Sequence, residues 1–348
     1  MNVQAGTGAP GTERPLAPER IRFMARTAFH AERGARARLI ARVPVTSAHG
    51  DRPPIFIIGC GRSGTTLLGD LFAAHPAVRY RREPYHRWAA VDPATDFLHL
   101  YSRGEHHCLL GADSVTATAR RRFGRLMSAP PDLTFVEKSP INSLRIGYLD
   151  ALAPEAQFVH IVRDGIDVTW SIDQVAAVTR RMAFRPPLNK WWGVGEAKWT
   201  ALVRDGRAAG YYSDEVCQLT TDGQRGAYEW LLSLHEVDSW RARLGSRFVE
   251  FRYQDLTNDP GTTLRTVMAA VGLPCPDSWL EHATSRVSPA SSSAGKGLTL
   301  PDQMCDDFNG FQAGLGFVGR ATMRHHGGWS DGGSKPGQPS GYTSSRTR

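Results

Sequence analysis

The stretch from Pro53 to Leu68 constrains the fold more than any other part of the chain, because three kinds of local structure follow one another in it. An apolar, largely β-branched run from Ile55 to Ile58 is typical of a buried strand, and glycines at positions 59 and 61 interrupt it. From Gly64 the leucine spacing is that of a helix. Glycines let a ligand approach the backbone, and the first N–H groups of a helix favour an anion. The sequence therefore predicts a strand, a phosphate-binding loop and a helix.

The loop departs from the common nucleotide-binding loop, G-x-x-x-x-G-K-[ST], at its lysine. The two glycines have the required spacing, but Thr65 stands where the lysine is expected, and the cationic residue, Arg62, lies inside the loop. The predicted strands that end at Lys138 and Val162 lead into serine and arginine, not into a magnesium-binding aspartate. A P-loop kinase that uses ATP is therefore the weaker alternative, and we expect no metal.

The octapeptide Gly61-Arg62-Ser63-Gly64-Thr65-Thr66-Leu67-Leu68 resembles the 5′-phosphosulfate loop of sulfotransferases that use 3′-phosphoadenosine 5′-phosphosulfate (PAPS). Because the loop contains an arginine, it is similar to the variant of this loop in tyrosylprotein sulfotransferases and in bacterial enzymes of that type. The resemblance covers roughly residues 53–318 and implies an α/β fold, a P-loop-type parallel β-sheet flanked by helices on both faces. It also implies that PAPS is the cosubstrate and that the loop binds it through Gly61, Arg62, Ser63, Gly64, Thr65 and Thr66.

Two charged residues receive catalytic roles from the same resemblance. Glu83 lies 21 residues after Arg62, which is the offset of the catalytic glutamate in the tyrosylprotein sulfotransferase pattern. A base must take the proton of the acceptor hydroxyl, and we assign this role to Glu83. Lys138, in the segment Glu-Lys-Ser-Pro, is then the cation that stabilises the leaving oxygen. Asn142, just after it, either hydrogen-bonds the cosubstrate or caps the following helix, and we favour the cap. Cytosolic members of the wider family use histidine as base, so three rival bases remain: His86, His106 and His107.

A second phosphate motif follows the apolar run 157–162, which predicts another buried strand. Arg163, and Ser171 eight residues later, resemble the family's motif for the 3′-phosphate of PAPS. Arg163 offers a planar fork for bidentate phosphate binding, and Ser171 lies about two helical turns further on, where its hydroxyl can reach the same ligand and the transferring group. We expect Asp164 and Asp167 to cap the helix and orient Arg163, not to hold a metal.

Further along the chain, residues 252–273 resemble the family segment that packs near the adenine through Tyr253. The polar run 291–297 stands where relatives close a loop over the 3′-phosphate, which makes Lys296 a candidate ligand; a solvated loop is the alternative. The aromatic-rich residues 184–212 are either a lid over the acceptor pocket or a peripheral helical hairpin with buried tryptophans. The strands of the predicted sheet are centred near Ile55, Val78, Phe135, Val159 and Val249.

The expected organisation is a disordered tail over residues 1–18, a basic helical lead-in over 19–50, a sulfotransferase domain over 51–326 and a second disordered tail over 327–348. The arginine-rich lead-in either lies on an anionic membrane or a partner, or packs on its own domain, which we favour.

Composition narrows the possible partners. A net charge of +8 fits an anionic small ligand or nucleic acid, but the basic residues are spread among the motifs, so a non-enzymatic nucleic-acid module is a further alternative and no nucleic acid is expected. Five widely spaced cysteines without a C-x-x-C pair fit a reducing compartment, and no apolar run approaches the roughly 18 residues of a membrane span.

We therefore expect a cytoplasmic enzyme of secondary metabolism that moves a sulfuryl group from PAPS to a hydroxyl of a small-molecule natural product or glycan. Protein-tyrosine sulfation remains an alternative, and a homodimer is a possible assembly.

Overall fold

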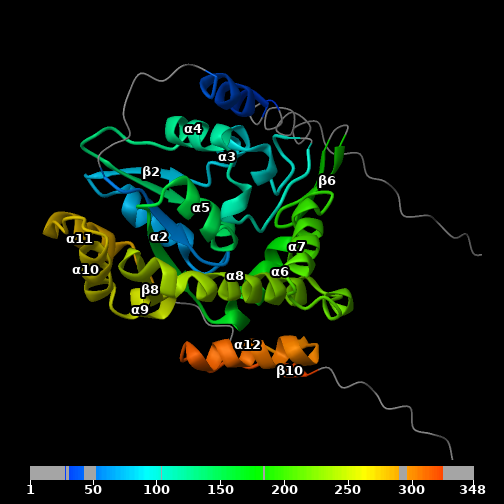
Figure 1. The fold of residues 1–348 in the computed structure, drawn as a ribbon. Coiled ribbons are helices and arrows are strands. Elements are labelled where there is room, and N and C mark those ends of the chain that lie inside the picture. Colours follow the sequence, from blue (N-terminus) through cyan, green and yellow to red (C-terminus); the bar gives the residue numbers. More distant parts are fainter. Residues whose placement is uncertain are drawn as a thin grey trace, which may run out of the picture.

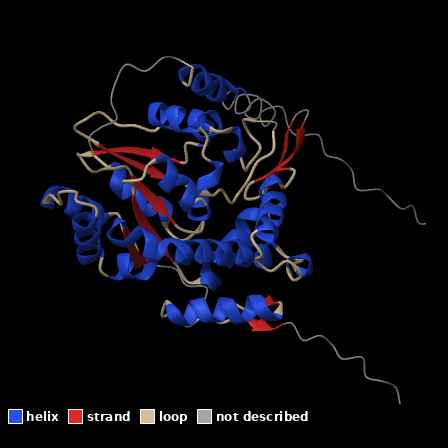
Figure 2. Ribbon diagram, in the orientation of Figure 1, coloured by secondary structure: helices blue, strands red, loops and turns tan. Residues whose placement is uncertain are grey.

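Five short parallel strands form the central sheet of the computed structural model, in the order β2-β3-β1-β4-β8 (Figures 1 and 2). Every neighbouring pair is parallel, and all five predicted strands are present, so the predicted α/β fold class is confirmed. The structure describes residues 28, 31–42, 52–102, 104–182, 185–289 and 296–323. The strands are β1 (Ile55–Ile58), β2 (Val78–Arg82), β3 (Thr134–Lys138), β4 (Gln157–Val162) and β8 (Phe248–Arg252).

Alternating side chains along the strands produce two buried faces, as strand geometry requires. Ile55 and Ile57 lie in one apolar cluster, whereas Phe56 and Ile58 lie in another on the opposite face. The helices that contribute to the first cluster are α2 (Thr65–Ala73), α9 (Tyr253–Asn258), α10 (Pro260–Ala270) and α11 (Asp277–Ser285). Those of the second cluster include α3 (Tyr85–Val91), α4 (Ala117–Leu126) and α5 (Ile146–Leu152). Both faces of the sheet are therefore covered by helices, as predicted.

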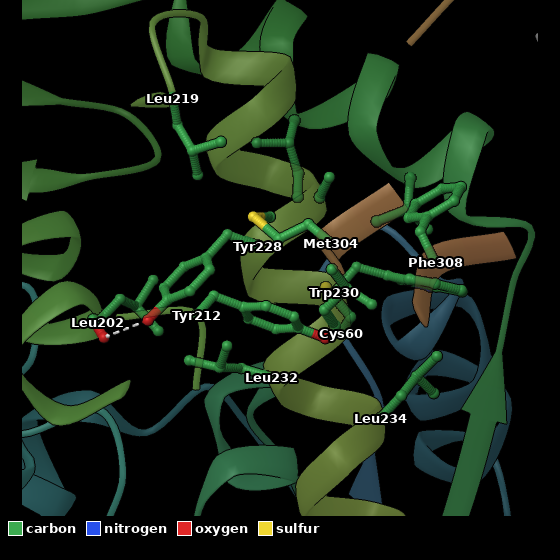
Figure 3. Close-up of a cluster of buried hydrophobic side chains, with 14 of the residues drawn as sticks. Cys60, Leu202, Tyr212, Leu219, Tyr228, Trp230, Leu232, Leu234, Met304 and Phe308 are labelled. Carbon is green, nitrogen blue, oxygen red and sulfur yellow. Dashed lines mark hydrogen bonds between the residues drawn. The ribbon is translucent and has the colours of Figure 1, made fainter. Parts of the chain in front are cut away.

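The long helix α8 (Asp222–Leu244) joins this sheet layer to a third apolar cluster. Its last turns pack on the sheet, and its first half packs against α6 (Gly165–Ala176), α7 (Ala197–Ala208) and α12 (Asp302–Gly314). Figure 3 shows Trp230 and Leu234 of α8 beside Phe308 of α12 and Cys60, the second residue after β1. The loop after β1 thus begins on a packed apolar support.

The aromatic-rich segment forms a small antiparallel sheet followed by α7, so the predicted helical hairpin is wrong. Proline lacks the N–H that a helix interior needs and shifts the preceding residue towards extended conformations, and Pro186 and Pro187 both lie in the middle strand. Trp192 is nevertheless fully buried, as that alternative required of its tryptophans. The strands of this sheet are β5 (Thr179–Met182), β6 (Arg185–Asn189) and β7 (Gly193–Val194).

Several short elements complete the described chain. Strands β9 (Thr299–Leu300) and β10 (Thr322–Met323) pair in parallel. The short 3₁₀ helices are η1 (Pro93–Thr95), η2 (Ala112–Ser114), η3 (Pro140–Leu144), η4 (Val216–Gln218) and η5 (Gly245–Arg247).

The basic lead-in contains a helix over residues 31–40 that packs on the rest of the chain through small residues. Ala37 and Ala41 are buried, and Arg125 Nη1 of α4 donates a hydrogen bond to the Ala41 carbonyl oxygen at 2.9 Å. For these residues the favoured expectation, packing on the own domain, is confirmed. The predicted tails, 1–18 and 327–348, lie outside the described residues. Within the described chain no helix is both long and apolar enough to cross a membrane.

Strand β3 carries a fully buried carboxylate, Glu137. Its Oε1 atom accepts hydrogen bonds from Trp88 Nε1 (3.1 Å) and Ser139 Oγ (2.6 Å), and its Oε2 atom accepts one from Asn142 Nδ2 (2.6 Å). The expectation that Asn142 caps the next helix is wrong, because a cap requires its Oδ1 atom to accept a backbone N–H, and this buried oxygen has no hydrogen-bond partner. Burial raises the pKa of Glu137 to about 7, against the lowering effect of the Ser139 and Trp88 donors.

This buried carboxyl predicts a pH-dependent stability. The pKa of Glu137 in the folded state lies above its value in the unfolded chain, so its stabilising contribution is complete at acidic pH and is lost as the pH rises towards about 7. Glu137→Gln removes this titration, and the glutamine N–H can donate to Asn142 once that amide reverses. Urea unfolding at pH 5 and pH 8 should show wild type losing on the order of 2–3 kcal/mol relative to the variant.

The matched control is Glu281→Gln, at an exposed glutamate of α11, which should follow the wild-type pH dependence. Equal pH dependence in wild type and Glu137→Gln would contradict the prediction.

Candidate functional site

The carboxyl ends of the five parallel strands bring the predicted site residues to one edge of the sheet. Glu83 follows β2, Lys138 ends β3, the loop 59–64 follows β1, Arg163 follows β4 and Tyr253 follows β8. Ligands of open α/β sheets bind at this edge, where strand order reverses. The strand order β2-β3-β1-β4-β8 therefore sets the order of these groups along the edge.

The loop after β1 has a backbone that glycine alone adopts without strain. Gly59 has φ 144°, and a Cβ atom there would lie 2.4 Å from the carbonyl oxygen of Ile161. Gly64 has φ 97°, and a Cβ atom there would lie 2.3 Å from the ring of Tyr253. Helix α2 begins directly after Gly64, and the N–H groups of its first turn have no acceptor within the helix. The predicted strand, loop and helix are confirmed, and their geometry suits an anion.

Arg62 and the second phosphate motif meet beside this loop, although 109 residues separate Arg62 from Ser171. Arg62 Nε donates a hydrogen bond to Ser171 Oγ at 2.9 Å. Arg163 Nη1 donates to the carbonyl oxygen of Arg62 at 3.3 Å. Three residues predicted from two separate motifs thus form one hydrogen-bonded group with two guanidinium cations.

The two aspartates of the second motif have the roles expected from the sequence. Asp164 caps α6, because its Oδ1 atom accepts a hydrogen bond from the Ile166 N–H at 2.8 Å. Asp167 Oδ2 accepts one from Arg163 Nη2 at 3.2 Å, which orients the guanidinium. Among the residues that the structure describes, no cluster of three or more histidine, cysteine, aspartate or glutamate side chains could hold a metal ion.

Glu83 and Lys138 form an ion pair on the other side of the loop. The fully buried Lys138 Nζ donates to Glu83 Oε1 and, at 2.9 Å, to Thr66 Oγ1. The side chain of Glu83 is 33% exposed, so it is the member of the pair that an acceptor molecule can reach. Its backbone is left-handed, with φ 44°, a conformation that costs a non-glycine residue on the order of 1–3 kcal/mol and that is typical of functional sites.

Tyr85, the first residue of α3, also belongs to this group, although sequence reasoning assigned it no role. Burial and the charge of Glu83 raise the pKa of Tyr85 well above its usual range. The phenol is therefore neutral beside the Glu83 carboxylate. Its position two residues after the predicted base was the only sequence signal for it.

Two of the rival bases are engaged with the region of α7. His106 Nε2 lies 3.1 Å from the Ala197 carbonyl oxygen, and His107 Nδ1 lies 3.0 Å from Asp205 Oδ1. The third, His86, has its ring 6.2 Å from that of Tyr101. Glu83 is hydrogen-bonded to Lys138, which in turn contacts Thr66 after the phosphate loop. His106 and His107 are hydrogen-bonded to residues of α7 instead.

The remaining predicted ligands also lie near the second motif. The Tyr253 ring packs on Gly64, and the Arg163 guanidinium carbon lies 4.8 Å from the centroid of that ring. Lys296 Nζ lies 4.5 Å from the centroid of Trp170, the residue before Ser171. Residues 290–295 of the predicted polar run lie outside the described chain.

A family model matches part of the chain: that of the sulfotransferase family matches residues 53–210. Over 144 residues the chain is 26% identical to the nodulation protein NoeE of Sinorhizobium fredii (strain NBRC 101917 / NGR234), a match that covers 35% of this chain and 32% of NoeE. Over 244 residues it is 24% identical to an uncharacterized protein of Aquifex aeolicus (strain VF5), which covers 67% of this chain and 27% of that protein. The chain thus spans less than a third of the length of each of these two relatives.

Among solved structures, the sulfotransferase domain from the curacin biosynthetic pathway is similar, with 14% identity and a TM-score of 0.46 over 77% of this chain and 98% of that one. The family match confirms, for residues 53–210, the recognition of the sulfotransferase family from the sequence.

Proposed function

We propose that this chain transfers a sulfuryl group from PAPS to a hydroxyl group of a small-molecule natural product or glycan. The observation that carries the proposal is the meeting of two cationic groups at one sheet edge: Arg62 with Arg163 and Ser171, and Lys138 with Glu83. Between them lies the N-terminus of α2. This arrangement supplies separate places for two phosphates and for a reacting hydroxyl.

Donor binding divides between the two motifs. The first-turn N–H groups of α2 and the hydroxyls of Thr65 and Thr66 suit the 5′-phosphosulfate, because helix N-termini bind anions. Arg163 and Ser171 suit the 3′-phosphate, with Lys296 nearby and Tyr253 beside them as a ring for the adenosine. Charge-assisted hydrogen bonds from a guanidinium are among the strongest that a phosphate can receive. The group of charges therefore favours a nucleotide with phosphates at both positions.

The chemistry assigned to the chain is an in-line displacement. PAPS supplies the sulfuryl group, and its bond to the bridging phosphate oxygen breaks as the acceptor oxygen bonds to sulfur. Glu83 takes the proton from the acceptor hydroxyl, and Lys138 holds the Glu83 carboxylate in place beside the neutral Tyr85 phenol. Lys138 and Arg62 stabilise the negative charge that develops on the leaving oxygen, and Ser171 orients Arg62. The products are the sulfated acceptor and adenosine 3′,5′-bisphosphate.

The half-buried ring of Tyr85, two residues after Glu83, supports an acceptor with an apolar ring face. The buried ring of Phe97 contacts it edge to face, with ring centroids 5.3 Å apart. Partly exposed aromatic rings bind the faces of sugars and aromatic compounds. Mass spectrometry of a panel of hydroxylated metabolites and glycans incubated with PAPS should reveal the mass gain of one sulfuryl group in the true acceptor.

The role of Arg163 is tested by comparing two nucleotides. Isothermal titration calorimetry should show that wild type binds adenosine 3′,5′-bisphosphate more tightly than ADP. Arg163→Lys keeps the charge but loses the bidentate fork, so affinity for the bisphosphate should fall about 10- to 100-fold. Affinity for ADP, which lacks the 3′-phosphate, should change little.

Arg252→Lys, at an exposed strand-end arginine paired with Asp255, serves as the matched control and should bind both nucleotides as wild type does. Preference for ATP with magnesium over the bisphosphate would instead support the kinase alternative. Equal weak binding of every nucleotide, with a steep salt dependence, would support the nucleic-acid alternative.

The role of Glu83 is tested by Glu83→Gln, which keeps the shape of the side chain and removes the base. Turnover should fall roughly 10²-fold or more, with bisphosphate affinity nearly unchanged. Glu105→Gln, at a glutamate whose side chain is mostly exposed, is the control and should turn over like wild type. Wild-type turnover in Glu83→Gln would transfer the base role to a histidine.

A further inference from the structure

A tryptophan of the aromatic segment, Trp191, packs against the backbone of the phosphate loop. A Cβ atom on Gly61 would lie only 2.3 Å from Trp191 Cη2 and 2.8 Å from Cζ2. The edge of the indole therefore touches the backbone of Gly61 directly, without an intervening side chain. Trp191 precedes β7, about 130 residues after the loop that it contacts.

The indole is held in place from three directions. The backbone N–H of Trp191 donates to Asn189 Oδ1 at 2.8 Å, and Nε1 donates to Glu229 Oε2 at 2.9 Å. Lys198 Nζ lies 4.0 Å from the centroid of the indole ring, a cation–π distance. Few rotations of the ring preserve all of these contacts.

The groups that hold Trp191 form a buried ion pair. Lys198 Nζ lies 2.6 and 2.7 Å from the two carboxylate oxygens of Glu229, and both side chains are at least 95% buried. Burying two charges costs more free energy than packing apolar residues of the same size. The pair therefore adds little net stability, and both of its members contact the indole of Trp191.

Cys60, the residue before Gly61, also packs near this ion pair, in the apolar cluster that contains α8 residues and against which Trp191 packs. Burial and the charge of Glu229 raise the pKa of the Cys60 thiol. Ser233, one helical turn after Glu229 on α8, accepts a hydrogen bond from Ser143 Oγ through its Oγ atom at 3.1 Å. Figure 3 shows Cys60 among the side chains of α8. Two consecutive loop residues are thus supported by packing: Cys60 by apolar side chains of α8, and Gly61 by Trp191.

We propose that Trp191 is a positioning residue for the donor loop, held on Gly61 by the Lys198–Glu229 pair. This inference rests on the proposed function, because it assigns the loop to the donor. Arg62, the next residue, has φ 74°, a left-handed backbone that needs support from its surroundings. Fixing Gly61 fixes the direction in which the Arg62 side chain leaves the loop towards Ser171. In this proposal the aromatic segment braces the donor site and does not act as a lid.

The positioning role of Trp191 is tested by hydrogen exchange of residues 59–66 in the ligand-free chain and by calorimetry with adenosine 3′,5′-bisphosphate. Trp191→Ala should speed exchange of these amides and weaken bisphosphate binding, each by about tenfold. Trp191→Phe, which keeps a ring against Gly61, should recover part of both losses. The matched control is Trp199→Ala, a half-buried tryptophan of the same segment that packs on Trp192 and Tyr228.

Trp199→Ala should lower the melting temperature yet leave loop exchange and bisphosphate affinity as in wild type. The proposal is overturned if Trp191→Ala matches wild type in loop exchange and in affinity. It is also overturned if Trp191→Ala speeds exchange in the sheet strands 55–58 and 134–138 as much as in the loop, because the effect is then global. If wild type itself does not bind the bisphosphate, the proposed function fails, and the exchange result still decides whether the brace exists.

Discussion

Parallel pairing of β1 with its two neighbours is the constraint on which the whole site depends. The register places Ile57 beside Lys138 on one side and Ile58 beside His160 on the other. Because all strands run in the same direction, whatever follows each of them emerges at one edge. A carboxylate, a lysine, a glycine-containing loop and a second cationic motif come together there, although more than 100 residues separate Arg62 from Ser171.

The charges at this edge form two groups, and each contains its own carboxylate. Arg163 is paired with Asp167, and Lys138 with Glu83. These pairs reduce the repulsion among the nearby cations in the absence of a ligand. A ligand with two phosphates can bring further negative charge to both groups. In the second pair Glu83 is partly exposed and Lys138 is fully buried, so a substrate can reach the carboxylate more easily than the ammonium group.

Local sequence signals were enough to predict the frame of the molecule. Apolar runs marked the strands, glycines marked the loop, and the spacing of Arg163, Asp164 and Asp167 indicated a cap and an ion pair that the structure contains. The resemblance to a family supplied Glu83, whose hydrogen bond to Lys138 has no signature in the sequence between them.

The missed features depend on packing between distant segments. Trp191 was recognised only as part of an aromatic stretch, because nothing near it in sequence reveals that Gly61 lies against its ring. Asn142 was misassigned as a cap because its amide nitrogen binds the buried carboxylate of Glu137 and its Oδ1 atom caps no helix, and this buried contact cannot be read from a short polar motif. The two prolines of β6 are visible in the sequence, but the prediction of a helical hairpin gave more weight to the tryptophans of this segment.

A crystal structure of the chain with adenosine 3′,5′-bisphosphate tests the central claim most directly. The 5′-phosphate should lie on the backbone of residues 61–66, and the 3′-phosphate should lie between Arg163 and Ser171 of the same nucleotide. A bisphosphate that touches only one of these motifs, or that binds away from this edge of the sheet, would contradict the assignment of the site.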